Sequence, residues 1–358
     1  MPLFLIWVRD SLVVILVAGA AALGLLFVSL VLTRLWLMAG DARARRRRTR
    51  YLPVVAALGD RATAGAALAA LGKVPRAHRP AVGRLLLEAM RVTSGEYVDQ
   101  LRTGASTLGL IDVWRQQLTS RQWWRRAEAA QALGLLRKPG ISDVLLPLLD
   151  DPHEDVRAAA VGALGLAGDP LVIPALLARL ADESRHQRVR IIEALQQFGT
   201  EVGPPLLAHA DAHPALVPLL AHLVGELRLT AAAEHVLTWT QDANASVRAA
   251  AFQALGTIGV DGRAFYYVLK GLSDEDAETR GMAVRALGRA GREDALPYLE
   301  PLLHDEWIVA AQTARALRSL GGAGVAALER AAAGLGMAGE LARHVLWERR
   351  AAQPAGPA

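Results

Sequence analysis

The stretch 154–182, EDVRAAAVGALGLAGDPLVIPALLARLAD, decides the fold. Its first half places apolar residues three and four positions apart, which is the spacing of one helix face. Gly168 follows where the end of a helix favours glycine, and Asp169-Pro170 then leads into a second apolar segment. The stretch therefore predicts two short helices joined by a tight turn.

The same pattern returns about every 31 residues. Segments aligned on a shared Ala-Leu place that alanine at positions 132, 163, 194, 254, 286 and 316. The gap between 194 and 254 spans two units, so a degenerate helix is expected within PALVPLLAHLVGELRL at 214–229. One helix pair of this length cannot bury its apolar faces alone, whereas stacked copies can. The repeat predicts an all-α fold, an α-solenoid of stacked helix pairs.

The pattern D-x-x-x-x-V-R-x-x-A-x-x-A-L-G-x-x-G-D-P at 151–170 resembles the HEAT repeat, in the short bacterial form also seen in phycobilin lyase-like proteins. The resemblance covers about 120–325 well and 51–120 loosely. It implies HEAT-like repeats over 121–325, divergent capping helices or repeats over 51–120, and C-terminal capping helices over 326–350. The tail 351–358 is expected to be disordered.

An apolar run precedes the repeats. Residues 11–33 contain no charge, and about 20 such residues suffice to cross a bilayer. Before this run the charges of Arg9 and Asp10 cancel, and the arginine cluster follows it, which favours an uncleaved anchor over a cleaved signal peptide. The predicted segments are a flank at 1–10, a transmembrane helix at 11–38 and a basic juxtamembrane linker at 39–50, and the positive-inside rule sets their orientation. The expected location is the inner (cytoplasmic) membrane, single-pass, with the N-terminus outside and the solenoid in the cytoplasm.

Basic charge is concentrated beside that run. Residues 34–50 hold seven arginines and one aspartate, a net +6 in a chain of net +5, so the remainder carries −1. A nucleic-acid-binding solenoid would instead carry its arginines along a binding face, although such a module stays an alternative. Six arginines are expected to meet anionic lipid headgroups. They are Arg43, Arg45, Arg46, Arg47, Arg48 and Arg50.

An arginine recurs early in the first helix of most units. In HEAT repeats this position pairs with the acid of the turn, so the resemblance implies a structural ladder. Its expected members are Arg126, Arg157, Arg190, Arg248 and Arg280. A ligand-binding row is the alternative. The late unit has Ala310 instead, and the degenerate unit around Val217-Pro218 has no arginine, which fits a ladder better than a continuous binding row.

Residues for chemistry are sparse. The chain has no cysteine, which excludes disulfides, thiolate nucleophiles and Cys-ligated zinc. His209 and His213 share a spacing of four, but Pro214 follows and no glutamate accompanies them, so a turn is expected there. The sequence thus predicts no cofactor, no metal site and no enzyme. The lyase branch of the resemblance leaves a bilin lyase-like or other small-molecule enzyme as an alternative.

Aromatic residues are few, so their positions matter. Trp and Tyr are enriched in the residues that dominate protein interfaces. The candidate partner-binding residues are Trp123, Trp124, Tyr266, Tyr267 and Trp307. Together these features predict a membrane-anchored scaffold or adaptor for a protein partner, which is expected to be a membrane protein or membrane enzyme. By analogy with membrane HEAT-repeat proteins, it is expected to serve as an accessory subunit of an envelope glycosyltransferase or polysaccharide synthesis complex.

Overall fold

The computed structural model describes residues 2–138, 140–181, 184–260 and 262–352. The chain divides into two compact units, unit 1 (1–136) and unit 2 (137–358). Every regular element among the described residues is an α-helix or a 3-10 turn, which confirms the all-α prediction. Strings of Ala and Leu favour this outcome because both residues have high helix propensity.

Unit 1 contains six α-helices in the described residues. They are α1 (Pro2–Ala56), α2 (Arg61–Gly72), α3 (Arg79–Val92), α4 (Glu96–Thr107), α5 (Leu110–Gln117) and α6 (Trp123–Gly134). Its core includes the fully buried Leu71, Leu86 and Leu101. Gly104 lets α4 approach closely, since a Cβ there would lie 3.0 Å from Leu71 Cδ1.

Residues 39–50, which the sequence predicted as a linker, are helical, because α1 continues through them to Ala56. Arginine and alanine are good helix formers, and no proline intervenes before Pro53. The arginines of this turn-free segment differ in their surroundings. Arg48 pairs with Glu88 of α3 through both oxygens, at 2.8 and 2.9 Å, and Arg47 Nη1 donates to the Ala77 carbonyl at 3.4 Å. Part of the basic segment thus packs on its own unit.

The membrane prediction needs correction. Among the residues that the structure describes, no helix combines the length and the apolar character needed to span a bilayer. The side chains of 11–22 lie outside the described ones. This finding contradicts the transmembrane helix at 11–38 and the inner-membrane location. Lipid contact by Arg43, Arg45, Arg46, Arg47, Arg48 and Arg50 loses its basis with them.

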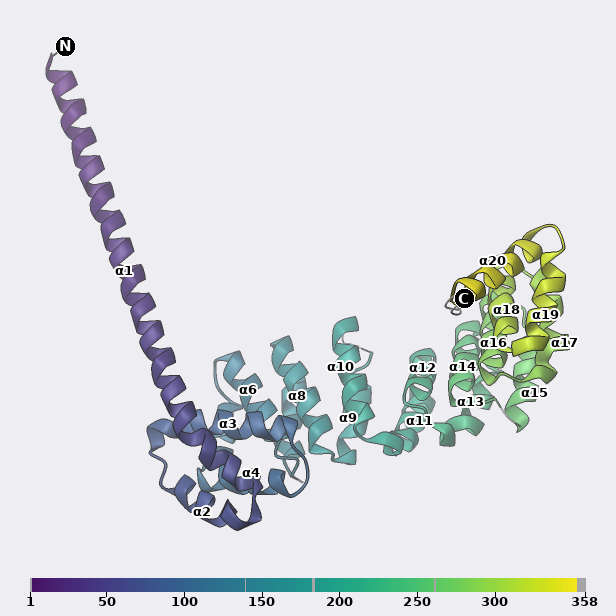
Figure 1. Cartoon of the computed structure of the whole chain (residues 1–358), viewed down its shortest axis with the longest axis horizontal. Helices are drawn as coiled ribbons and strands as arrows, with labels where there is room; N and C mark the ends of the chain where they lie inside the picture. Colours follow the sequence, from purple (N-terminus) through teal and green to yellow (C-terminus); the bar gives the residue numbers. More distant parts are fainter. Residues whose placement is uncertain (1, 139, 182–183, 261, 353–358) are drawn as a thin grey trace, which may run out of the picture. The chain divides into compact units, whose positions relative to one another are not determined.

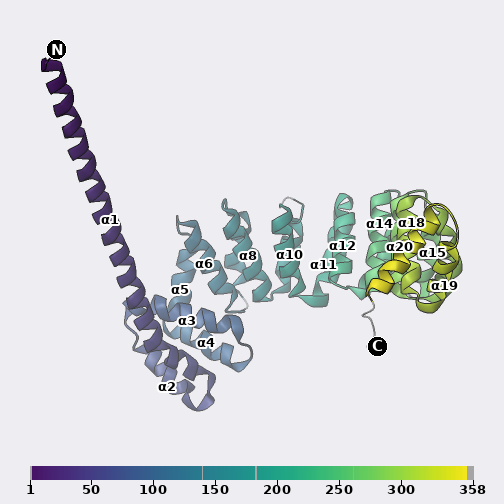
Figure 2. The ribbon, with the colours of Figure 1, turned by 45° about the horizontal axis from the view of Figure 1, so that its top comes forward.

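Unit 2 is a series of short helix pairs (Figures 1 and 2). The first helices of successive pairs are α8 (Glu154–Ala167), α10 (Arg185–Gln196), α12 (Val217–Glu226), α14 (Ala245–Ile258), α16 (Ala277–Ala290) and α18 (Trp307–Ser319). The second helices are α9 (Ile173–Ala178), α11 (Gly203–Ala212), α13 (Ala233–Trp239), α15 (Gly262–Gly271), α17 (Leu296–Leu299) and α19 (Gly321–Ala332). A short α7 (Ser142–Leu145) precedes them, and α20 (Met337–Ala352) follows. Helix α12 stands where the sequence predicted a degenerate unit.

Successive first helices cross at the glycine of the Ala-Leu-Gly signature. A Cβ on Gly165 would lie 2.9 Å from Ala194 Cα, and one on Gly256 would lie 2.9 Å from Ala286 Cα. The same relation joins Gly288 to Ala316, where the Cβ would lie 2.7 Å from the alanine Cβ. A glycine in one repeat therefore accommodates the repeated alanine of the next repeat, which explains why the two residues recur together.

One crossing departs from this rule. In the unit of α10, Gln196 stands where the glycine is expected, and in α12 Leu223 stands where the alanine is expected. Helix α10 packs against α8, and α12 packs against α14, but α10 and α12 share little contact within the described residues. Larger side chains at both positions prevent the close crossing that glycine and alanine allow elsewhere.

The C-terminal end closes with α19 and α20, and α20 packs against both α18 and α19. Of the tail expected to be disordered, 351–352 belong to α20, and 353–358 lie outside the described residues.

Candidate functional site

The recurrent arginine has one constant contact. Its Nη1 donates to the carbonyl six residues earlier in the turn before its own helix. The pairs are Arg126 with Ser120 (2.8 Å), Arg157 with Asp151 (3.1 Å), Arg248 with Asp242 (3.0 Å) and Arg280 with Asp274 (2.9 Å). Each guanidinium thus ties its helix to the turn that enters it.

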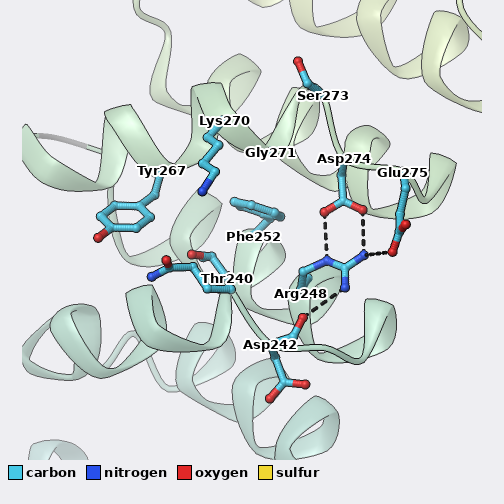
Figure 3. A pocket seen from close by; sticks show the side chains of 11 residues that line it. Thr240, Asp242, Arg248, Phe252, Tyr267, Lys270, Gly271, Ser273, Asp274 and Glu275 are labelled. Carbon is cyan, nitrogen blue, oxygen red and sulfur yellow. Dashed lines mark hydrogen bonds and ion pairs between the residues drawn. The ribbon is translucent and has the colours of Figure 1, made fainter.

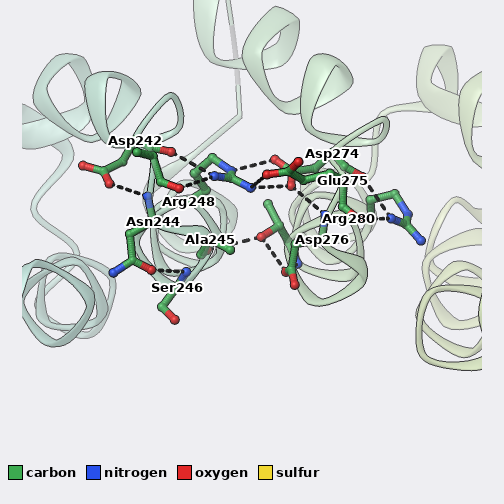
Figure 4. A network of polar contacts seen from close by, with 11 residues as sticks. Asp242, Asn244, Ala245, Ser246, Arg248, Asp274, Glu275, Asp276 and Arg280 are labelled. Atoms are coloured by element: carbon green, nitrogen blue, oxygen red, sulfur yellow. Dashed lines mark hydrogen bonds and ion pairs between the residues drawn. The ribbon is translucent and has the colours of Figure 1, made fainter.

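In the last repeats the same arginine also contacts the next repeat (Figure 4). Arg248 Nε and Nη2 each donate to one oxygen of Asp274 at 2.8 Å. Arg280 does the same with Asp305, at 2.9 and 2.7 Å. Only 10% of the Arg248 side chain and 12% of the Asp274 side chain are exposed. These parallel two-point pairs join consecutive repeats.

The environment of these carboxyl groups holds them ionised. Burial opposes the charge of Asp274, but hydrogen bonds from Arg248 and from the Asp276 amide outweigh it, so the pKa of Asp274 lies below its ordinary value. The hydrogen bond from Arg280 is the largest influence on Asp305 and lowers its pKa. Both pairs are therefore charged at neutral pH.

Arg190 stands apart from the other expected ladder residues. It is exposed, whereas Arg188 is half-buried and occupies the position six residues before the repeated Ala194. The arginines 126, 157, 248 and 280 all keep this distance from their alanines. The structure therefore gives the ladder register to Arg188 rather than to Arg190.

A pocket of about 590 Å³ lies beside the Arg248–Asp274 pair (Figure 3). It is lined by Thr240, Gln241, Asp242, Arg248, Phe252, Tyr267, Lys270, Gly271, Ser273, Asp274 and Glu275. Gly271 is required here, because a Cβ would lie 2.4 Å from the Phe252 ring. On one wall Arg248 pairs with Asp274 and Glu275, and the Thr240 hydroxyl donates to the Leu237 carbonyl at 2.7 Å. This arrangement suits a structural joint between repeats.

The candidate partner-binding aromatics fall into three separate places. Trp123 and Trp124 begin α6 in unit 1, with 37% and 51% of each residue exposed and their rings edge to face at 6.1 Å. Tyr266 and Tyr267 lie on α15 in unit 2 with rings 5.7 Å apart. Trp307 begins α18 and is 65% exposed. Within the described residues, no ring contact joins Trp307 to the two tyrosines.

Sequence reasoning missed Tyr298. This residue precedes the buried Leu299 of α17 just as Tyr267 precedes the buried Val268 of α15, so the two tyrosines hold equivalent positions in consecutive repeats. Tyr298 is 54% exposed and Tyr266 is 66% exposed. The sequence signal that could have identified Tyr298 is its position in the second helix of the repeat, which is hard to recognise because α17 is short.

The two spaced histidines differ from expectation. His209 lies inside α11 rather than in a turn, and His213 follows the helix end. Their rings stack with centroids 4.2 Å apart, and burial, with the nearby His213, lowers the pKa of His209. Across the described parts of the chain, no cluster of three or more potential ligands could hold a metal ion.

Comparison with known proteins points to a repeat family. A family model described as HEAT repeats matches residues 111–196, 142–237 and 233–318, which together cover more than half of the chain. No curated protein matches the chain.

Several solved structures are similar at low identity. The complex of CpcE and CpcF of phycocyanin lyase from Nostoc sp. PCC7120 has 19% identity and a TM-score of 0.31, covering 66% of this chain and 94% of that chain. Human deoxyhypusine hydroxylase in complex with glycerol has 19% identity and a TM-score of 0.29, covering 87% and 99%. Kap121p has 14% identity and a TM-score of 0.47, covering 81% of this chain and 39% of its own.

Proposed function

This chain belongs to the HEAT-repeat family, and we propose that it is a non-enzymatic scaffold that binds a protein partner through α15 and α17 of unit 2. No observation on the described residues supports the membrane and glycosyltransferase elements of the sequence-based expectation. Extended stacks of helix pairs offer long surfaces suited to protein binding.

Exposed tyrosines carry the proposal. Tyr266 and Tyr298 expose more than half of their surfaces on the second helices of consecutive repeats, and Tyr267 lies beside Tyr266, half-buried. Tyrosine combines a large apolar ring with a hydroxyl, and it loses little side-chain entropy on binding. Tyr267 and Tyr298 hold equivalent positions on the second helices, and Tyr266 adds an exposed ring next to Tyr267.

The helices that carry the tyrosines are anchored by buried residues. Val268 and Leu299, their neighbours in sequence, are fully buried, which anchors each helix against its pair. Between the two helices, the Arg292 guanidinium lies 3.9 Å from the centroid of the Phe265 ring. A surface that is already ordered loses little conformational entropy when a partner binds.

Capture from whole-cell extract of the source organism tests the proposal. The full chain is immobilised beside a Tyr266→Ala/Tyr298→Ala variant, and retained proteins are compared by mass spectrometry. A protein enriched at least tenfold on the unaltered chain is then purified and its Kd for both forms is measured. Equal retention by both forms, repeated with the purified protein, would show that the tyrosine surface is not the binding site.

A further inference from the structure

A second surface of unit 2 lies on the layer of first helices. A groove of about 450 Å³ lies along the crossing of α16 and α18. It is lined by Arg285, Gly288, Arg289, Gly291, Gln312, Arg315, Ala316 and Ser319. Three guanidinium groups thus surround a groove whose lining contains no carboxylate.

These arginines lack acidic partners among the described residues. Arg289 Nη1 donates to the Thr257 hydroxyl at 2.8 Å, and Arg285 Nη1 contacts the Met282 sulfur at 3.4 Å. Arg315 is exposed on the facing helix. Other arginines of these repeats are paired with carboxylates, namely Arg248, Arg263, Arg280, Arg318 and Arg330. The three groove arginines are therefore left free to bind an anion.

Placing them together has an energetic cost in the free protein. Arg285 and Arg289 are four residues apart on α16, so their like charges repel across one helical turn. Arg315 adds a third positive charge from α18. An anion in the groove would relieve this repulsion. The planar fork of each guanidinium matches a carboxylate at two points, which strengthens the contact and fixes its geometry.

The groove can also form hydrogen bonds. Gln312 lines the groove beside the arginines. The Ser319 hydroxyl lies at the floor of the groove, 2.6 Å from the carbonyl oxygens of both Gly288 and Ala316. Gly288 and Ala316 sit at the helix crossing and carry no long side chain, so the middle of the groove stays open. A main chain could therefore lie along it with its side chains directed at the arginines.

At one position of the first helices, positive charge occurs in α16 and α18 and not in the repeats before them. The residue before the repeated alanine is Glu193 in α10, Gln253 in α14, Arg285 in α16 and Arg315 in α18. Residues 137–358 contain 21 Lys and Arg against 27 Asp and Glu, a net charge of −6. An acidic segment is attracted to the groove and repelled from the rest of the unit, which fixes where it binds.

From these observations we propose that the groove between α16 and α18 binds a short carboxylate-rich segment of a protein partner. A nucleic acid fits less well, because its continuous phosphates would extend from the groove over the negative remainder of the unit. The inference goes beyond the tyrosine surface, since it concerns the other layer of helices and has its own residues.

Fluorescence anisotropy tests the proposal with the full chain. The probe is a fluorescein-labelled peptide of eight alternating Glu and Ser residues, and the comparison peptide has Gln in place of Glu. At low ionic strength the Glu peptide is expected to bind at least tenfold more tightly than the Gln peptide. Binding is expected to weaken as salt is added, because the contacts are charged and partly exposed.

A matched pair of triple variants locates the binding. Arg285→Gln/Arg289→Gln/Arg315→Gln is expected to weaken the Glu peptide at least tenfold. Arg190→Gln/Arg263→Gln/Arg330→Gln removes the same charge from exposed positions elsewhere on unit 2 and is expected to change the Kd less than twofold. Circular dichroism and thermal melting check that both triple variants are folded, and the single change Arg315→Gln provides a milder variant.

Two results would overturn the assignment. Equal weakening by both triple variants would mean that the peptide senses only overall charge. A single-stranded oligonucleotide of eight bases that binds more tightly than the Glu peptide, and loses that affinity in the groove variant, would assign the groove to nucleic acid. Neither result bears on the tyrosine surface, whose variants leave the groove intact.

Discussion

Arg248 and Asp274 lie 26 residues apart and meet through two parallel hydrogen bonds of 2.8 Å, joining one repeat to the next. The same guanidinium holds the carbonyl of Asp242 in the turn of its own repeat. One side chain therefore fixes both the entry to its helix and the position of the following unit.

Removing this arginine should destabilise the protein strongly. Arg248→Ala leaves the poorly exposed Asp274 without its partner, and loss of one member of a buried pair costs about 3 kcal/mol of unfolding free energy. Urea unfolding followed by circular dichroism measures the change. Arg263→Ala is the control, because its pair with Glu234 is exposed on both sides and should contribute less than about 1 kcal/mol. Similar losses in the two variants would contradict the role of the ladder.

Stability should fall in acid because of the same pairs. The folded-state pKa values of Asp274 and Asp305 are lowered. At a pH low enough to protonate these carboxylates in the unfolded chain, they therefore stay ionised in the native protein. Their contribution is complete above the unfolded pKa, about 3.9, and is lost as pH falls through the lower folded values.

Urea unfolding between pH 7 and pH 3 measures this dependence. Asp274→Asn/Asp305→Asn should be less stable at pH 7 yet lose less stability on acidification than the unaltered chain. An identical slope in both proteins would show that other groups control the acid response.

The glycines at the crossings should not tolerate a methyl group. Gly256→Ala puts a Cβ within 2.9 Å of the Ala286 backbone, so α14 and α16 must separate, at about 1–3 kcal/mol. Gly162→Ala is matched in kind, since Gly162 is a helix glycine with open space around it. That change should instead stabilise the protein by up to about 1 kcal/mol through helix propensity. Thermal unfolding of both variants should show opposite shifts.

The exposed tyrosines should matter for binding and not for folding. Tyr266→Ala/Tyr298→Ala removes two largely exposed rings, so the unfolding free energy should change by less than about 1 kcal/mol. Capture of the partner should fall at least tenfold. Trp347→Ala, on α20 and 66% exposed, serves as the aromatic control and should leave capture unchanged. Loss of capture in the control as well would point to general stickiness of exposed rings.

The repeat was predictable because one local pattern encodes it. Apolar spacing, the C-terminal glycine Gly168 and the period near 31 residues each favour short helix pairs, and the helices of unit 2 follow them. The continuous helix through 39–50 was missed because a dense run of arginines was read as a linker, although arginine favours helix and Arg48 finds Glu88 on α3.

The site was harder to predict because it depends on register and on distant partners. The motif QRVR offers Arg188 and Arg190, and only the distance to Ala194 separates the ladder position from an exposed one. The groove arginines are visible in the sequence, but their freedom from carboxylates depends on how α16 and α18 face each other. Local patterns contain no such information.

The altered crossing at Gln196 and Leu223 has a consequence for how unit 2 unfolds. In a linear array, stability depends on nearest-neighbour coupling, and cooperativity extends only as far as that coupling is strong. Weak contact between α10 and α12 divides the array, so the helices from α12 onward should open as one cooperative block and those from α7 to α10 as another. Native-state hydrogen exchange would then report two free energies of opening, with the boundary inside α11. A mechanical load applied across the unit would extend it first at this point.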